Sequence, residues 1–255
     1  MKTIKFNKEC ISYPTNFDDL TVADFLRIYS RLDELDSESN VYFIDFVAVV
    51  LDVDFDIAYQ LPDTIIPDIR FILDSKLMQS ADITKEEKPD TIKINKDLTI
   101  VLPDKLIDSQ TTIGQAEAFR AITLNIEKKN KTPEIDSLLL SLNSNENYEM
   151  SEEQSIEYQK YLFNCYTGNI KKIHELAAIY LQPIIMRTAF SPILAKEIAQ
   201  ALLKCKVYDI FYVAFFLIMK YNSNLVAKIK NFQAKELLNY CQKLKTSLKN
   251  AKGTH

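Results

Sequence analysis

One stretch of the chain begins like the H-E-x-x-H helix of zinc peptidases: His174-Glu175-Leu176-Ala177-Ala178. That chemistry needs two imidazoles one helical turn apart to hold the metal, with a glutamate between them to activate water. Position 178 is alanine, and the chain's other histidine is His255. We therefore expect no metal site, and we expect His174 to lie at the polar edge of an amphipathic helix.

Asp52, Asp54 and Asp56 resemble the opening of a calcium-binding loop. Such a loop needs glycine at its sixth position for a sharp turn and a bidentate glutamate at its twelfth. Ile57 and Asp63 occupy those positions. The pattern predicts helix caps and a solvated acidic surface instead of a calcium site.

Other catalytic patterns lack a required part. A serine or cysteine nucleophile needs a histidine base, and His174 is the sole internal histidine. Phosphate-binding loops need glycine, but the chain has three glycines and neither G-x-G-x-x-G nor G-x-x-x-x-G-K-[ST]. The carboxylates are numerous, yet no pair is marked as an acid–base couple. We predict that the protein is not an enzyme and uses no cofactor.

Charge is distributed unevenly along the chain. Residues 16–82 contain fifteen Asp or Glu and four Lys or Arg, whereas residues 220–252 contain eight lysines and one acid, Glu236. These lysines are the candidate binding residues, for phosphates or for an acidic partner: Lys220, Lys228, Lys230, Lys235, Lys243, Lys245 and Lys249, followed by Lys252. The segment has no arginine, which favours a solvated helix face or an acidic protein partner over nucleic acid. Alternatively, the two ends neutralise one another in the fold or between the subunits of a homo-oligomer.

A seven-residue phrase occurs twice, as Thr3 to Glu9 and as Thr91 to Asp97. Each copy predicts the centre of a short β-hairpin, over residues 2–13 and 91–102, which ends at Pro14 or Pro103. Each hairpin leads into a helical pattern. The repeat indicates two related modules, residues 1–82 and 91–255, or a chance match in a chain rich in Lys, Ile and Asn.

Helical patterns occupy most of the remaining chain, and the low glycine content also favours helices. Ser151-Glu152-Glu153-Gln154 is a capping box that opens a helix to Tyr166, with Gly168 as its left-handed exit. Asn169 is the expected cap of the next helix, which should end at Pro183. Ser191-Pro192 opens another helix, to Lys204. Further helices are expected at the ranges 21–32, 41–51, 54–59, 64–78, 112–129, 206–221 and 223–250, with a strand as the alternative for residues 41–51.

The fold class follows from these assignments. We predict a mainly α protein of the α+β class, with helical modules that each follow a small β-hairpin and with a C-terminal helical bundle. Residues 131–150 contain Pro133 and a Ser/Asn-rich stretch, which favour a flexible linker. The four cysteines form no C-x-x-C pair and are expected to be buried free thiols of a reducing compartment. No apolar run is long enough to span a bilayer, so we expect a soluble, cytosolic protein without a membrane partner.

Four fragments occur in an order shared with a known family. They are Tyr13-Pro14 with Asp19 to Tyr29, Thr111 to Gln115, Ile173 to Pro183, and the aromatic segment Val207 to Met219. Together they resemble morphogenesis proteins of tailed bacteriophages and prophages of Bacteroides-type hosts, crAss-like phages included. The chain departs from that pattern at Gln115-Ala116-Glu117, where an aromatic or aliphatic residue is expected after the glutamine.

The resemblance implies a protein that binds other phage proteins of the tail, neck, portal or capsid without catalysis. It implies either a tail assembly chaperone or a virion component, located in the host cytoplasm or in the virion. The alternative is a packaged, DNA-associated virion protein that uses the lysine-rich segment.

Overall fold

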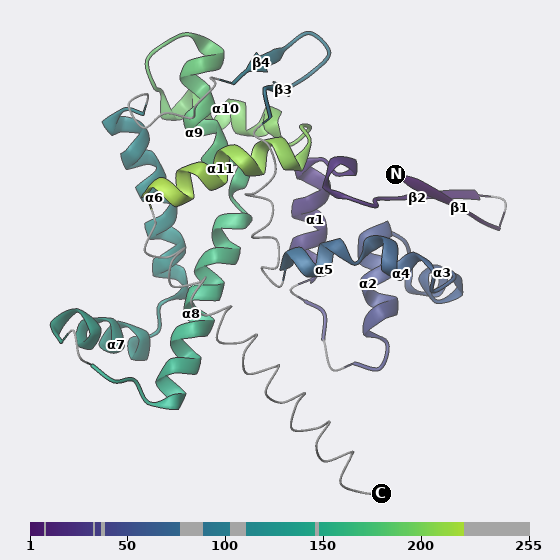
Figure 1. The fold of residues 1–255 in the computed structure, drawn as a ribbon, viewed down its shortest axis with the longest axis horizontal. Helices are drawn as coiled ribbons and strands as arrows, with labels where there is room; N and C mark the ends of the chain where they lie inside the picture. The colour runs from purple at the N-terminus through teal and green to yellow at the C-terminus, as the bar shows by residue number, and fades with distance from the viewer. Residues whose placement is uncertain are drawn as a thin grey trace, which may run out of the picture. The chain divides into compact units, whose positions relative to one another are not determined.

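The computed structural model describes residues 1–7, 9–32, 34–36, 39–76, 89–102, 111–145 and 148–221. The protein is mainly helical and has two small antiparallel two-stranded sheets, which confirms the predicted fold class (Figure 1). The chain divides into two compact units. Unit 1 consists of Met1–Phe119 and Lys171–Leu217, and unit 2 of Arg120–Ile170 with the residues from Ile218 onward. Both hairpins belong to unit 1, and the division into the modules 1–82 and 91–255 stays a prediction from sequence.

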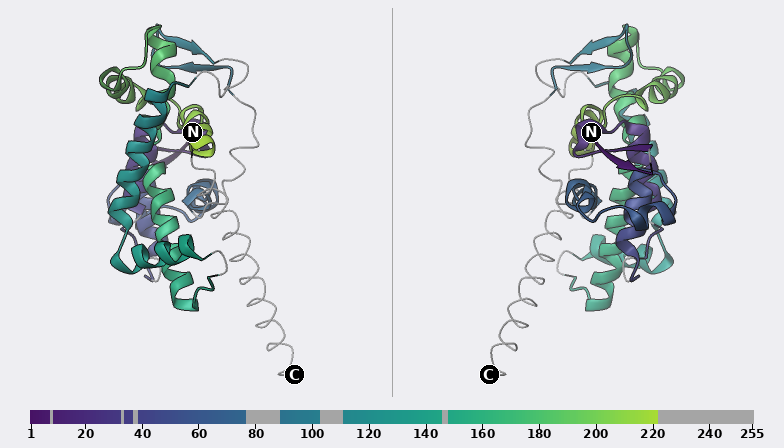
Figure 2. Two further views of the ribbon diagram at one scale, coloured as in Figure 1. Left: turned by 90° about the vertical axis from the view of Figure 1, so that its left-hand side faces the viewer. Right: turned by 90° about the vertical axis from the view of Figure 1, so that its right-hand side faces the viewer.

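Both predicted hairpins are present (Figures 1 and 2). Strands β1 (Lys2–Phe6) and β2 (Glu9–Tyr13) pair from Lys2 opposite Tyr13 to Phe6 opposite Glu9. Strands β3 (Thr91–Lys93) and β4 (Thr99–Val101) pair in the same antiparallel sense. An asparagine shapes each turn: Asn7 has φ 46°, and the side chain of Asn95 accepts hydrogen bonds from two backbone N–H groups, those of residues 97 and 98.

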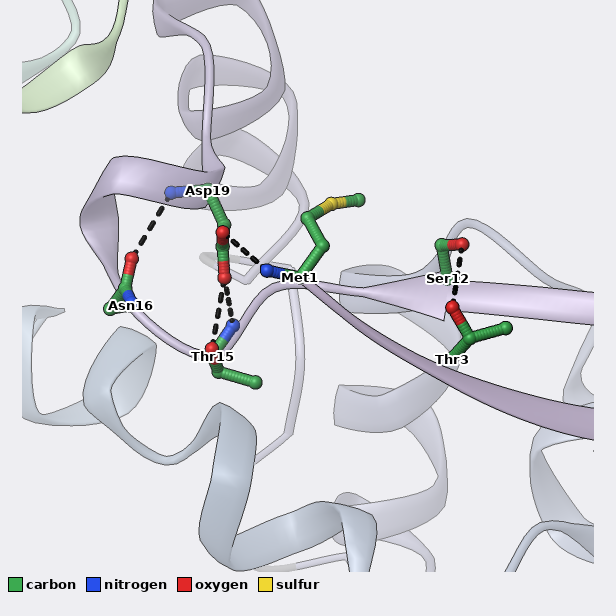
Figure 3. Close-up of polar contacts among 6 residues, drawn as sticks. All are labelled: Met1, Thr3, Ser12, Thr15, Asn16 and Asp19. Carbon is green, nitrogen blue, oxygen red and sulfur yellow. Dashed lines mark hydrogen bonds and ion pairs between the residues drawn. The ribbon is translucent and has the colours of Figure 1, made fainter.

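A group of polar contacts fixes the chain between the first hairpin and the first helix (Figure 3). The carboxylate of Asp19 binds the amino group of Met1 and accepts hydrogen bonds from the N–H and the hydroxyl of Thr15, at 2.8 and 2.9 Å. The side chain of Asn16 caps the 3-10 turn η1 (Phe17–Asp19). The hydrogen bond from the ammonium group, with those from Thr15, lowers the pKa of Asp19 to about 2. These contacts anchor the hairpin to the start of the helical part of unit 1.

Unit 1 is built mostly of short helices that pack on longer ones. Helix α1 (Val22–Leu32) begins where two backbone hydrogen bonds join it to the start of α11 (Val207–Tyr221). The N–H of Val22 donates to the carbonyl of Cys205 at 2.9 Å, and the N–H of Val207 to that of Leu20 at 3.0 Å. Helix α9 (Ile173–Met186) is buried along most of its length and packs against α10 (Pro192–Leu202). The helices of this unit are α1 (Val22–Leu32), α2 (Tyr42–Leu51), α3 (Phe55–Gln60), α4 (Ile65–Ile69), α5 (Phe71–Lys76), α9 (Ile173–Met186) and α10 (Pro192–Leu202), with the first parts of α6 (Ile113–Asn130) and α11 (Val207–Tyr221).

Unit 2 contains the second part of α6 with α7 (Pro133–Ser144) and α8 (Glu152–Ile170). The capping box at the start of α8 is confirmed, because Ser151 and Gln154 exchange backbone-to-side-chain hydrogen bonds of 3.0 and 3.2 Å. The predicted end of this helix is wrong: Gly168 is helical, and α8 continues to Ile170. A Cβ at Gly168 would lie 2.5 Å from Cγ2 of Ile126 on α6. Glycine is therefore present for a close helix contact, and not for a left-handed turn.

Two further boundary predictions in this region are also wrong. Asn169 does not cap the next helix; its side-chain amide donates to the carbonyl of Cys165 at 2.9 Å, and α9 has its N-cap at Lys172. Residues 131–150, predicted as a linker, contain α7. Thr132 caps α7 by accepting a hydrogen bond from the N–H of Ile135, and Pro133 occupies the first helical position, where it needs no hydrogen-bond partner.

The cysteines agree with the prediction only in part. Cys165 and Cys205 are buried free thiols, and burial raises the pKa of each to about 11. Cys10 is exposed on strand β2, because alternate residues of this two-stranded hairpin face solvent. Cys241 lies outside the described residues. Within the described ranges, no helix combines the length and the apolarity needed to cross a membrane.

Candidate docking surface around the α9–α10 loop

The predicted lysine site falls almost entirely outside the described residues. Lys220 lies in α11, although its side chain is not described, and the remaining members lie beyond residue 221: Lys228, Lys230, Lys235, Lys243, Lys245 and Lys249. The predicted C-terminal bundle extends into this part as well. The lysine face therefore remains a prediction from sequence.

The prediction that His174 lies at the polar edge of a helix is wrong. His174 is buried in α9, with 9% of the residue exposed. The pKa of its imidazole is lowered, because the effect of burial exceeds the opposing effect of the neighbouring Glu175 carboxylate. Its Nδ1 atom has no hydrogen-bond partner in the described part of the chain. No group of three or more His, Cys, Asp or Glu side chains there is placed to hold a metal. The first of the three aspartates considered as a calcium motif, Asp52, pairs with Arg31 and Arg27 at 2.9 and 3.2 Å.

Helix α9 continues through Pro183, although the sequence pattern predicts that the helix ends there. Proline has no N–H, so the carbonyl four residues earlier, that of Ile179, loses its helical donor. The side-chain amide of Gln115, on α6, donates to this carbonyl at 2.8 Å. Gln115 is 2% exposed, so the hydrogen bond is shielded from water. A long-range contact thus replaces the missing helical one.

The same glutamine also completes the N-terminal cap of α6. Its Oε1 accepts hydrogen bonds from the N–H and the hydroxyl of Thr112, at 2.8 and 3.2 Å. Thr112 Oγ1 in turn accepts from the N–H of Gln115 at 3.3 Å, which makes a capping box. Gln115 therefore uses both ends of its amide, one for the cap of α6 and the other for α9.

A second buried glutamine fixes the loop between α9 and α10. Gln182 is fully buried; its Oε1 accepts from the N–H of Ser191 at 2.8 Å, and its Nε2 donates to the hydroxyl of Thr188 at 3.2 Å. Arg187 ends α9 in the left-handed conformation, with φ 51°. Ser191 then caps α10, with Pro192 at its first position, as the sequence predicted. The loop is thus held at both ends.

Three large aliphatic side chains are exposed around this fixed loop. Gly114 brings the start of α6 close to Phe190, since a Cβ there would lie 3.3 Å from the ring's Cδ1. Ile113, the residue before Gly114, is 84% exposed. Ile193, in the first turn of α10, is 74% exposed, and Met186, the last residue of α9, is 42% exposed. We call Ile113, Met186 and Ile193 the loop surface. These three side chains are apolar, and Arg187 and Thr188 of the same loop are exposed beside them in the sequence. Exposed apolar side chains are typical of protein-binding surfaces.

The sequence pattern does not predict this surface. One part of it could have been predicted: the Thr112-x-x-Gln115 spacing matches a capping box as well as Ser151-x-x-Gln154 does, and indicates where α6 begins. The fragments Thr111 to Gln115 and Ile173 to Pro183, which both belong to the noted resemblance, are in direct contact through Gln115 and Ile179. The chain has no match among protein-family models, curated proteins or solved structures.

Proposed function

We propose that the protein is a non-enzymatic structural or assembly protein of a tailed bacteriophage, and that it binds other phage proteins through the loop surface. The observation that carries the proposal is the exposure of Ile113 and Ile193, at 84% and 74%, on a backbone held by hydrogen bonds of two buried glutamines, Gln115 and Gln182. The resemblance of the four sequence fragments to phage morphogenesis proteins supplies the identity of the partners: tail, neck, portal or capsid proteins.

The geometry suits protein binding for an energetic reason. Covering apolar side chains removes them from water, at roughly 25 cal/mol per Å². Ordering a mobile loop on binding would offset part of this gain. Here Gln182 already fixes the loop, and Gln115 fixes the start of α6. A partner therefore meets a surface whose backbone needs little further ordering.

Two versions of this function differ in whether the protein stays in the particle. A tail assembly chaperone covers a client such as the tape-measure or tail-tube protein until assembly, and then leaves. A virion component keeps its contacts. Mass spectrometry of purified virions separates the two, because only a component is present in stoichiometric amounts. If the protein co-purifies with no tail, neck, portal or capsid protein at any stage of assembly, the phage role is wrong.

A DNA-associated role is the second candidate, and it rests on the eight lysines and one acid of residues 220–252. Lysines that neutralise phosphates release counterions, so binding weakens steeply as salt increases. This role predicts that the full chain is retained on duplex DNA at low salt and released as salt rises. Indifference to duplex DNA at low salt would remove this candidate.

A further inference from the structure

Helix α3 has one side packed in unit 1 and an exposed aromatic side. Ala58 is 5% exposed, whereas Phe55 is 41% and Tyr59 68% exposed. The two rings stack one helical turn apart, with centroids 6.4 Å from each other and planes at 21°. Residues of an α-helix advance by about 100° each, so Phe55, Asp56 and Tyr59 lie on one continuous side of α3.

Three carboxylates accompany these rings along the chain: Asp54 at the N-cap of α3, Asp56 within it and Asp63 shortly after it. Asp54, Asp56 and Asp63 are exposed, and none of them forms an ion pair with the described part of the chain. Nearby Asp68, by contrast, pairs with Lys2 at 2.7 Å. Residues 52–69 contain five aspartates and no Lys or Arg. We call Phe55 and Tyr59 with Asp54, Asp56 and Asp63 the α3 surface.

The chemistry of this surface fits a lysine-rich segment. An ammonium group can pair with a carboxylate or lie over the face of an aromatic ring, and the lysine stem can cover apolar surface. This chain contains such a segment, since residues 220–252 have eight lysines and one acid. We infer that the α3 surface of one molecule binds the lysine-rich segment of a second copy of this chain.

Such a contact joins two different patches of the same protein. Each molecule that donates its lysine-rich segment keeps its own α3 surface available, so the contact can repeat from copy to copy. Opposite charges at the two patches also speed their encounter and make it dependent on salt. The inference is independent of the phage role, because purified protein suffices to test it.

Sedimentation velocity of the full-length protein over a range of concentrations tests the inference. We expect association at about 50 mM salt that is lost at about 500 mM, since screening shortens the reach of charge interactions. The variant D54N/D56N/D63N should weaken the association constant about tenfold, the combined effect of three exposed ion pairs of typical strength. Asparagine keeps the shape of each side chain, and Asp54 makes no capping hydrogen bond that would be lost.

A matched control removes the same charge elsewhere. Asp90, Asp97 and Glu197 are exposed acids of unit 1 outside the α3 surface. The variant D90N/D97N/E197Q should associate as the wild type does. Equal weakening by both variants would mean that net charge alone acts, and would overturn the assignment to α3. The variant Y59S should also weaken association, since it removes the more exposed ring.

Mixing two defective variants decides whether the contact joins separate molecules. D54N/D56N/D63N keeps the lysine-rich segment, while K228Q/K230Q/K235Q keeps the α3 surface. Each alone should associate weakly, and an equimolar mixture should form a heterodimer. A wild-type protein that stays monomeric at every concentration at low salt would overturn the inference. The same holds if the monomer only becomes more compact at low salt, since the contact would then lie within one molecule. These outcomes do not bear on client binding, which is measured separately.

Discussion

The side-chain amide of Gln115 donates a hydrogen bond of 2.8 Å to the carbonyl of Ile179, the carbonyl that Pro183 leaves without a helical donor. A proline inside a helix normally costs about 3 kcal/mol, partly because this hydrogen bond is lost. In this protein the donor comes from another helix, α6. The contact allows α9 to extend one turn beyond what its own sequence indicates, to the start of the α9–α10 loop.

Replacing Gln115 should therefore destabilise the protein. Q115A leaves the buried carbonyl of Ile179 without a donor and breaks the capping box with Thr112, so we expect a loss of about 2 kcal/mol in the free energy of unfolding. Chemical denaturation monitored by circular dichroism measures it. Q154A, in the capping box of α8, is the matched control. It removes that cap and a contact with the Tyr148 hydroxyl but leaves no buried carbonyl without its donor, so it should lose about 1 kcal/mol.

A double-mutant cycle isolates the role of the proline. P183A restores an N–H that can donate to the carbonyl of Ile179, so Q115A should cost about 1 kcal/mol less in that background than in the wild type. Identical costs in both backgrounds would mean that Gln115 does not compensate for Pro183.

The second prediction concerns the effect of G168A on stability. In an exposed helix, glycine to alanine gains about 1 kcal/mol. Here the added methyl group would lie 2.5 Å from Cγ2 of Ile126, so G168A should reduce the free energy of unfolding instead. The double variant G168A/I126A should cost less than the sum of its single variants, since alanine at 126 makes room. Strict additivity of the two costs would contradict the close contact.

The third prediction concerns pH. Burial lowers the pKa of His174 below the value of about 6.5 that it has in the unfolded chain. As pH falls, His174 therefore takes up a proton in the unfolded state before it does so in the folded state. The stability that neutral His174 provides is complete above about pH 6.5 and is lost as pH falls toward the lower pKa of the folded state. Denaturant unfolding at about pH 7.5 and about pH 5.5 should show lower stability at the acidic value.

Two variants test whether His174 causes this pH dependence of stability. H174Q cannot titrate, and should show a smaller difference between the two pH values than the wild type. H255Q removes the other histidine of the chain and should leave the difference unchanged. If H255Q and H174Q flatten the profile equally, burial of His174 is not its cause.

The fourth prediction tests α7, the helix found where a linker was expected. T132A removes the side-chain oxygen that accepts from the N–H of Ile135, and should destabilise α7 by about 1 kcal/mol. Hydrogen exchange of the amides in residues 136–144 should become several-fold faster, while exchange in α9 stays the same. Rapid exchange of these amides in both proteins would show that α7 is not formed in solution.

The features that sequence could predict depend on neighbouring residues. The hairpin turns are set by Asn7 and Asn95, and the caps at Ser151 and Ser191 are complete within four residues. For the same reason the mainly helical class was predictable. The cap at Thr132 was equally local, but the Ser/Asn-rich composition after it favoured a linker.

The wrong boundaries depend on residues far along the chain. Pro183 ends a helix only if no other group donates to Ile179, and Gln115 lies 64 residues before that carbonyl. Gly168 permits a turn as readily as it permits close packing, and the neighbour that decides, Ile126, is on another helix. The loop surface was missed because exposure of Ile113 and Ile193 is a property of the folded chain.

The proposed function is tested most directly by quantitative cross-linking mass spectrometry of assembling phage that carries a surface variant. I113S/I193S should leave the free energy of unfolding within about 0.5 kcal/mol of the wild type, since both side chains are exposed. It should lose its cross-links to phage structural proteins, while L140S, which alters an exposed leucine of α7, keeps them. Unchanged cross-links for I113S/I193S would contradict binding through the loop surface.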